Sequence, residues 1–292
     1  MEAFLHVDRR CGNIMLDLTI VIFTKNEQNN IKECIESVKE FSEVLVIDSN
    51  SSDSTRAIAH SLGIDVIEFN WNRRYPKKRQ WTLDNVSINN DWVLFLDADE
   101  RMSKQLEHEL EIFLARDSKA YAGGLIEIDY YFASKRLRFG QKPRKLVLLR
   151  VGKVSYPVID DLHAEGMGEL EGHYQPIVEG KVRKFKSRIA HNDRDPISTW
   201  MTRHVNYARW EAHLMRNLMQ KNKVDSSKGK MASVAHKLPF RPILFFIYSY
   251  ILKFGFLDGK AGFDYAFAKS WYYWLSGVIA REGEQSELQA KP

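Results

Sequence analysis

Two aspartates that directly follow an apolar run are the first residues in this chain with spacing suited to chemistry. Residues 92–96 are apolar on both faces and too few for a helix, which predicts a buried strand. Asp97, Ala98 and Asp99 come next. Because open α/β sheets bind ligands beyond the carboxyl ends of their strands, these carboxylates could hold a divalent cation. A helix with acidic first residues would give the same pattern.

Two more aspartates upstream could contact a nucleoside. Asp48 follows the apolar run 44–47, and a carboxylate at a strand end can accept hydrogen bonds from a ribose hydroxyl or a base N–H. Asp53 lies in a Ser/Asp-rich turn, where capping of the following helix is a strong alternative. The sequence therefore favours a binding role for Asp48 more than for Asp53.

A cluster of cations precedes the acidic strand. Arg73, Arg74, Lys77, Lys78 and Arg79 fall within seven residues, and a helix is predicted from about residue 77 to 86. Cations at a helix start oppose the helix dipole. This mismatch predicts that at least one of them contacts a phosphate.

The elements that must position these groups alternate between strand and helix patterns. In chain order the strands and helices are expected at about 18–23, 31–41, 44–47, 55–62 and 65–69. This alternation is typical of a doubly wound, mostly parallel sheet. The sequence lacks the Gly-x-Gly-x-x-Gly loop and the Walker lysine motif, which disfavours a Rossmann dehydrogenase and a P-loop enzyme.

Composition narrows the class further. A chain of 292 residues with 44% apolar content supports one large domain, or one domain and an appendage. Cys11 and Cys34 give no disulfide framework, so a reduced cytosolic environment is expected, with no signal peptide and no bilayer-length apolar run. The net charge of +5 suggests an anionic partner. Without zinc-finger or RNA-recognition signatures, nucleotide phosphates or a membrane are favoured over nucleic acid.

Four motifs in order resemble glycosyltransferase family 2. They are Thr24-Lys25-Asn26-Glu27, Asp48-Ser49-Asn50-Ser51-Ser52-Asp53-Ser54-Thr55, Lys78-Arg79-Gln80 and Leu96-Asp97-Ala98-Asp99-Glu100. Their form resembles the branch that contains lipopolysaccharide-core β-1,4-glucosyltransferases, over about residues 17–115. The resemblance implies an inverting enzyme of the GT-A fold that uses a nucleotide-diphosphate sugar.

The resemblance also implies roles for individual residues. Thr24, Glu27 and Asp48 would line the nucleotide pocket, and Lys78 and Arg79 would belong to the same nucleotide-sugar site. In a second group, Asp97 would lie nearer the ribose, while Asp99 would be the principal ligand of Mg²⁺ or Mn²⁺. Such an ion offsets the charge that develops on the leaving diphosphate. Gln80-Trp81 replaces the family's usual asparagine after the arginine.

The resemblance also implies that the second half of the sheet supplies the acceptor site and the catalytic base. Asp160-Asp161 is the nearest match to the family's acidic pair, with Asp161 preferred and His163 and Glu165 as rivals. A capping aspartate with a surface neighbour would look the same. His191 follows a lysine-rich strand at about 181–188, and the resemblance implies that it helps hold the metal or the diphosphate; a lone histidine there could equally be a structural residue.

Two regions are predicted. Residues 1–195 would form the catalytic domain, with a nucleotide-sugar half at about 17–115 and an acceptor half at about 116–195. Residues 196–292 would be helical, with a long helix at 197–219, a polar linker at 221–230 and an aromatic-rich end. Aromatic amphipathic helices flanked by Lys and Arg suit an anionic membrane surface. A homo-oligomer interface or a cap over the acceptor cleft is the alternative.

The leading function is an inverting hexosyltransferase. It would move a glucose-like sugar from a UDP-sugar donor to a lipid-linked or envelope glycan, in lipopolysaccharide or cell-surface polysaccharide synthesis. The protein would then be peripheral on the cytoplasmic face of the inner membrane. Two alternatives are a polyprenyl-phosphate sugar transferase and a non-catalytic GT-A-like binding protein.

Overall fold

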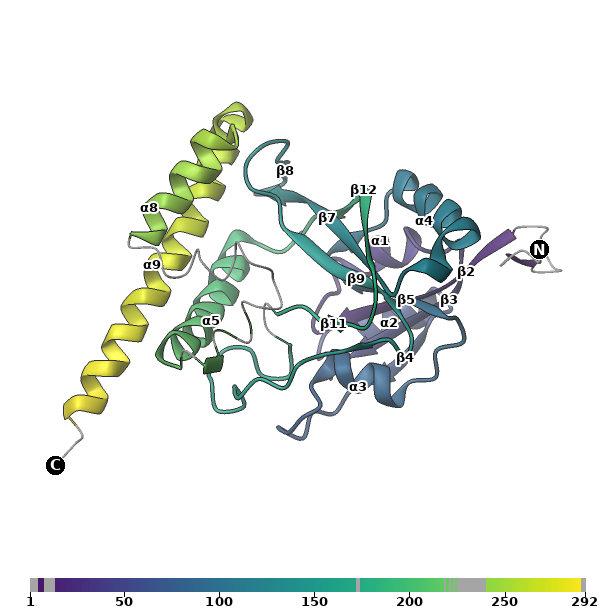
Figure 1. Ribbon diagram of the computed structural model, residues 1–292, viewed down its shortest axis with the longest axis horizontal. Coiled ribbons are helices and arrows are strands. Elements are labelled where there is room, and N and C mark those ends of the chain that lie inside the picture. The colour runs from purple at the N-terminus through teal and green to yellow at the C-terminus, as the bar shows by residue number, and fades with distance from the viewer. Residues whose placement is uncertain are drawn as a thin grey trace.

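A central ten-stranded sheet organises the molecule (Figure 1). The computed structural model describes residues 5–7, 14–171, 174–217, 219–220, 222, 224 and 240–289. The strand order is β4-β3-β2-β5-β9-β7-β12-β6, with β1 paired to β2 and β8 paired to β7. The strands are β1 (Leu5–Val7), β2 (Ile14–Thr24), β3 (Phe41–Asp48), β4 (Asp65–Glu68), β5 (Trp92–Asp97), β6 (Glu100–Arg101), β7 (Gly123–Phe132), β8 (Lys135–Arg136), β9 (Arg144–Arg150) and β12 (Val182–His191).

The first four long strands of the nucleotide half are parallel, as predicted. β2 pairs in parallel with β3 and β5, and β3 pairs in parallel with β4. Residues 92–96 of β5 are each at most 4% exposed. Helices cover both faces of this sheet, so a strand in its centre must be apolar on both sides. The predicted buried strand before Asp97 is therefore confirmed.

The crossover helices are α1 (Ile31–Glu36), α2 (Thr55–Ser61) and α3 (Lys78–Asn85), followed by α4 (Lys104–Arg116) and the short turn η1 (Ser118–Ala120). The prediction that the first helix reaches Phe41 is wrong. The Ser37 hydroxyl donates to the Cys34 carbonyl oxygen, and the chain turns there. Phe41 then begins β3 and is 1% exposed, because it packs into the core beneath the sheet.

The acceptor half is mixed. β9 runs antiparallel to both neighbours, β5 and β7, whereas β7 and β12 are parallel to each other. Consequently β2, β3, β5, β7 and β12 all point their carboxyl ends to one edge of the sheet. A small second sheet pairs β10 (Val154–Ser155) with β11 (Ile177–Val178). The polar groups predicted from the sequence fall at this shared edge.

The C-terminal region is helical, as expected. Its elements are α5 (Ile197–Arg216), α8 (Arg241–Phe246), the π-helix η2 (Ile247–Leu252), the 3₁₀ turn η3 (Gly255–Asp258) and α9 (Gly259–Gln289). In Figure 1, α8 lies along α9 on the side of the molecule opposite the N-terminal strands. The predicted helix at 197–219 ends at Arg216. Most of the predicted linker at 221–230 lies outside the described residues.

No single helix in the described part of the chain is long and apolar enough to cross a bilayer. One bent pair, Arg241–Leu252 with Gly255–Gly283, passes that test together by length and composition.

Candidate functional site

The carboxyl ends of β2, β3, β5 and β12 bring the predicted site residues together. Thr24 ends β2, Asp48 ends β3, Asp97 ends β5 and His191 ends β12. Asp99 follows β5 by two residues, and its carbonyl oxygen accepts from the Asn192 N–H at 2.9 Å. Parallel strands place these ends at one edge, which explains why positions 24 to 191 converge.

Asp48 is fully buried and organises the turn that follows it. Its Oδ2 accepts from the Thr24 hydroxyl at 2.8 Å and from the Ser51 hydroxyl at 2.5 Å. Its Oδ1 accepts from the Ser51 N–H at 2.8 Å. Asp53 in the same turn accepts from the N–H groups of Thr55 and Gln28, so it caps the turn as the alternative explanation proposed. The nucleotide role predicted for Thr24 and Asp48 remains a prediction.

Asp97 is held between two cations. Arg79 Nη2 lies 2.8 Å from its Oδ1, and Lys145 Nζ lies 2.6 Å from its Oδ2. Lys145 also lies 2.6 Å from the carboxylate of Glu100, which is 1% exposed. Burial alone would raise the pKa of Asp97, but the charges of Lys145 and Arg79 outweigh it and hold that pKa well below its usual range. Asp97 is thus an anion throughout the physiological range.

Asp99 and His191 face one another at the predicted metal position. His191 Nδ1 lies 3.3 Å from Asp99 Oδ1, and both side chains are largely buried. Burial would lower the pKa of His191, but the charge of Asp99 outweighs it and raises that pKa well above its usual range. The same contact lowers the pKa of Asp99 against the effect of burial.

The donor set fits a metal ion only in part. In the residues that the structure describes, no three His, Cys, Asp or Glu side chains converge on a point that could hold one. Asp99 Oδ1 is nevertheless buried without a hydrogen bond in this part of the chain, and His191 faces it. Asp97, the third predicted ligand, has both oxygens engaged by cations. The residues therefore offer two ligands, and further oxygens would have to come from a bound molecule.

Glu27 belongs to a second charged group on the same edge. Its Oε2 accepts from the Asn30 amide at 2.8 Å, and Arg203 of α5 lies 3.9 Å from its Oε1. Arg203 also pairs with Asp193 at 2.5 Å and with Asp195 at 3.2 Å. Burial, followed by the negative charge of Asp99, raises the pKa of Glu27 to about 8. Glu27 thus lies within electrostatic range of the predicted metal ligand.

The basic turn divides into three different environments. Lys77 pairs with Asp161 at 2.8 Å in a fully buried contact, so it is unavailable to a phosphate. Lys78 is 2% exposed and donates to the Thr24 carbonyl oxygen at 2.8 Å; burial lowers its pKa to about 8. Arg73 and Arg74 are exposed. Lys78 and Arg79 therefore remain as the cations of this turn that lie at the edge.

The carboxylate of Asp161 is buried, and both of its oxygens have partners. Its Oδ1 accepts from the Tyr75 hydroxyl at 2.5 Å and pairs with Lys77, and its Oδ2 accepts from Trp210 Nε1 at 2.8 Å. Its side chain is fully buried. A general base must reach the hydroxyl that it deprotonates, and Asp161 could do so only by giving up these partners. Asp160 and His163, the other predicted candidates, are exposed. The assignment of the base stays a prediction.

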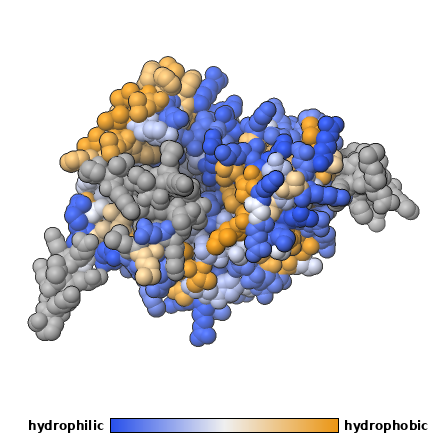
Figure 2. All heavy atoms as spheres, in the orientation of Figure 1, coloured by the Kyte–Doolittle hydropathy of each residue, from blue (hydrophilic) through white to orange (hydrophobic). Residues whose placement is uncertain are grey.

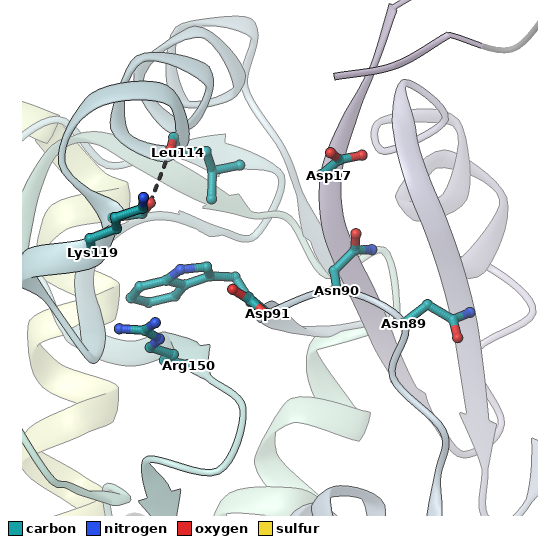
Figure 3. Close-up of a pocket in the computed structure, with 9 residues that line it drawn as sticks. Asp17, Asn89, Asn90, Asp91, Leu114, Lys119 and Arg150 are labelled. Carbon is teal, nitrogen blue, oxygen red and sulfur yellow. Dashed lines mark hydrogen bonds between the residues drawn. The ribbon is translucent and has the colours of Figure 1, made fainter. Parts of the chain in front are cut away.

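Two cavities lie near the sheet. One of about 420 Å³ lies at the opposite edge of the sheet, where Asp17, Asn90 and Arg150 are among its lining residues (Figure 3). It is therefore remote from the strand ends described above. The other, about 270 Å³, adjoins the amino end of α3 and has aromatic walls. Its lining residues are Tyr75, Pro76, Lys77, Gln80, Tyr156, Pro157, Val158, Glu171 and Tyr174. Glu171 of this lining accepts from the Arg79 N–H, which connects the cavity to the Asp97 cluster.

Three residues of the charged edge were missed by the sequence interpretation. Lys145 lies inside a predicted strand with no motif around it, and Arg203 lies in a helix predicted to pack on the core. Glu100 was noted only as part of the acidic motif. The distance of 48 residues between Lys145 and Asp97 carries no sequence signal. No sequence signal singles out Lys145, because Arg144 and Arg150 of the same strand are cations too.

Comparison with known proteins agrees with this site. The model described as "Glycosyl transferase family 2" matches residues 19–157, which contain all four motifs. Residues 19–157, just under half of the chain, therefore match glycosyltransferase family 2.

Individual relatives differ in how much they cover. An uncharacterized glycosyltransferase of Rickettsia bellii is 38% identical over 113 residues, which is 38% of this chain and 37% of the relative. This alignment spans less than half of the rickettsial protein. The lipopolysaccharide core biosynthesis glycosyltransferase LpsC of Rhizobium meliloti is 26% identical over 286 residues, covering 95% of this chain and 96% of LpsC.

Among solved structures, one match is the glucosyl-3-phosphoglycerate synthase of Mycobacterium tuberculosis in complex with Mn²⁺, UDP and glucosyl-3-phosphoglycerate. It is 24% identical, covers 39% of this chain and 44% of that chain, and has a TM-score of 0.30.

Proposed function

We propose that this protein is an inverting hexosyltransferase that moves a glucose-like sugar from a UDP-sugar to a lipid-linked or envelope glycan in lipopolysaccharide or cell-surface polysaccharide synthesis. The observation that carries the proposal is the convergence of Asp48, Asp97, Asp99 and His191 at one sheet edge within a family 2 domain. The end-to-end likeness to LpsC supports the acceptor class.

Charge balance at the edge supports a diphosphate donor. Lys78 has a single backbone carbonyl as its hydrogen-bond acceptor in the described part of the chain, and Arg79 shares its guanidinium with one carboxylate. An incoming diphosphate would give both cations a stronger partner than they have here. A nucleoside is proposed to lie toward Asp48, whose rigid turn fixes the end of β3.

Asp99 and His191 are proposed to hold Mg²⁺ or Mn²⁺ when the donor is bound, with the donor's oxygens completing the ligand set. The ion would supply electrostatic stabilisation of the leaving diphosphate. Lys145 and Arg79 keep Asp97 ionised and fixed in orientation. This preorganised arrangement needs no rearrangement as charge develops.

The aromatic cavity beside α3 is proposed to receive the acceptor saccharide. Tyr174 supports this placement because its buried hydroxyl has no hydrogen-bond partner among the described residues, although it lines the cavity. An unpartnered buried hydroxyl is costly unless a ligand satisfies it.

A screen of nucleotide sugars tests the proposed donor. Thermal stabilisation and slow donor hydrolysis would be measured for UDP-glucose, UDP-galactose, UDP-N-acetylglucosamine and GDP-mannose, each with Mn²⁺, Mg²⁺ or EDTA. We expect UDP-sugars to stabilise the protein in a metal-dependent way. Stabilisation by GDP-mannose alone would reject the UDP assignment, and no response to any of them would favour a binding protein without transferase activity.

A further inference from the structure

The C-terminal hairpin, residues 240–274 of α8, η2, η3 and α9, has an unusual surface. Twelve of the twenty exposed large apolar side chains in the described part of the chain lie in it. They are Phe240, Ile243, Leu244, Ile247, Ile251, Leu252, Phe254, Phe256, Leu257, Phe263, Phe267 and Trp274. Figure 2 shows the resulting hydrophobic surface at the end of the molecule where α8 meets α9. A patch of this extent indicates a partner.

The hairpin is a preformed, rigid element. Gly262 lies so close to the turn that a Cβ added there would meet the Gly255 carbonyl oxygen at 1.9 Å. Phe246 contacts Phe263 edge-on at 5.7 Å, and Ser270 donates to the Pro242 carbonyl oxygen at 2.8 Å. These contacts fold α8 back onto α9 and leave their apolar side chains outward. The exposed surface is therefore built by tight packing of the two helices.

The hairpin tip is fixed to the catalytic domain. The Asp258 carboxylate accepts from the N–H groups of Arg138 at 3.0 Å and Phe139 at 2.8 Å. The Gly140 N–H donates to the Lys253 carbonyl oxygen at 2.9 Å. A molecule that binds the tip therefore acquires a defined orientation relative to β7 and β9, the strands that precede and follow these contacts.

A second line of contacts runs from α9 toward the charged edge. Tyr265 packs on Tyr130 of β7 at 5.2 Å, and Tyr130 packs edge-on against His191 at 4.5 Å. His191 in turn faces Asp99. The hairpin and the strand ends thus share one continuous packed column.

Cations surround the tip and indicate the chemistry of its partner. Lys253 and Lys260 are exposed on the hairpin, and Lys135 and Arg138 are exposed on the turn bonded to it. Of the nearby acids, Asp258 has its carboxylate occupied by two backbone donors and Asp264 is half-buried. An apolar tip within a ring of cations matches the acyl boundary and the anionic headgroups of a lipid leaflet.

We propose that this hairpin is a lipid-inserting element that places its tip, Ile251–Leu257, in one leaflet of an anionic membrane without crossing it. Apolar side chains and exposed cations occur together on the hairpin, a combination that suits an anionic leaflet, whereas a second copy of the chain would bring like charges together. The fixed tip then holds the strand-end site at a constant orientation to the membrane surface. The inference does not depend on the identity of the donor.

Vesicle flotation of the full-length protein tests insertion. We expect binding to vesicles of phosphatidylglycerol and phosphatidylethanolamine and little binding to pure phosphatidylcholine. The double variant Leu252→Glu/Phe256→Glu should lose at least about tenfold in affinity, because charge at the acyl boundary is costly. The matched control is Ile112→Glu, which alters an exposed apolar residue of α4 on the catalytic domain and should bind like the parent protein. Equal binding by the parent and the tip variant would overturn insertion.

The charge contribution is tested separately. Lys253→Gln/Lys260→Gln should weaken binding to anionic vesicles about thirtyfold, since each lysine near the surface contributes roughly fivefold. The control Lys39→Gln/Lys181→Gln has the same net charge and should bind normally. If both pairs weaken binding equally, the attraction is diffuse and the proposed ring of cations is wrong.

Light scattering in solution distinguishes a second copy of the chain as the partner. We expect a monomer whose mass is unchanged in Leu252→Glu/Phe256→Glu. A stable dimer that this substitution dissociates would overturn the membrane assignment. None of these measurements requires donor binding or turnover, so a failed donor screen would leave the result interpretable.

Discussion

Buried carboxylates are handled in opposite ways at two places in this protein: the strand ends that carry Asp99, called the donor edge after its proposed role, and the segment around Asp161. At the strand ends, Asp99 faces His191, yet its Oδ1 is buried without a hydrogen bond among the described residues. In the acceptor segment, Asp161 pairs with Lys77 and has both oxygens occupied. A partly satisfied cluster is prepared for a ligand, whereas a fully satisfied pair holds the fold together. The comparison therefore predicts that Asp99 contacts a ligand and that Asp161 stabilises the fold.

Removing Asp99 should produce the largest effect. Asp99→Ala is expected to reduce transfer about 10³-fold, because ligand-supported stabilisation of the leaving diphosphate contributes several kcal/mol. Calorimetry should show that UDP binding no longer depends on Mn²⁺, while the melting temperature changes little. Asp17→Ala, at the opposite edge of the sheet, is the matched control. Unchanged metal dependence in Asp99→Ala would remove this residue from the binding group.

Breaking the ion pair between Asp161 and Lys77 should lower the stability of the protein. Asp161→Asn leaves Lys77 buried without its counter-ion, which should cost about 3–5 kcal/mol of unfolding free energy. The double variant Lys77→Met/Asp161→Asn should regain most of this loss, as measured by urea denaturation.

Activity of that double variant decides between two roles. Recovery of both stability and transfer would show that Asp161 is structural and is not the base. Recovered stability without transfer would instead support the predicted catalytic role of Asp161.

A substitution of Lys145 tests whether a cation that the sequence did not indicate contributes to catalysis. Lys145→Met should reduce transfer about 30-fold, because Asp97 and Glu100 would lose a shared charge-assisted partner. Steady-state kinetics of donor and acceptor would measure the loss. Lys153→Met, at an exposed position just beyond β9, should leave the rates unchanged. If the two variants behave alike, Lys145 is only a surface charge.

The buried Lys78 predicts how the unfolding free energy depends on pH. Its pKa is lowered to about 8 in the folded protein from an ordinary value of 10.5. Between pH 8 and 10.5 the unfolded chain therefore binds more protons than the folded protein, and the unfolding free energy rises with pH across this window. The stability that this group contributes is present above pH 10.5 and is lost as the pH falls to 8 and below. At pH 7, Lys78→Met should be more stable by about 1–3 kcal/mol but should lose stabilisation by UDP. A variant that keeps full stabilisation by UDP would place Lys78 outside the donor site.

Tyr174 should give the smallest effect. Tyr174→Phe removes a buried hydroxyl that lacks a partner among the described residues, so stability should be unchanged or slightly higher. If this hydroxyl contacts the acceptor, the acceptor KM should rise about fivefold, while UDP affinity stays the same. Tyr121→Phe, outside the cavity lining, is the control. An unchanged acceptor KM would exclude this contact.

Local pattern was sufficient to predict the donor half of the fold. The apolar run at 92–96 became β5, and Asp53 accepts from the Thr55 N–H at the start of α2, because backbone hydrogen bonding and burial act within a few residues there. The first helix was predicted too long because the local pattern did not show that Phe41 is needed in the core. The meeting of Asp99 with His191 depended on the order and direction of strands 92 residues apart.

The sequence by itself indicated the class of this protein, since its four motifs lie within the residues that match glycosyltransferase family 2. The tertiary structure alone decided which of the predicted cations remain available to a ligand. Lys77 and Lys78 are neighbours in a basic turn, yet one is committed to Asp161 and the other lies at the donor edge. The physical reason is that pairing of buried charges depends on contacts between distant segments, which composition and spacing do not encode.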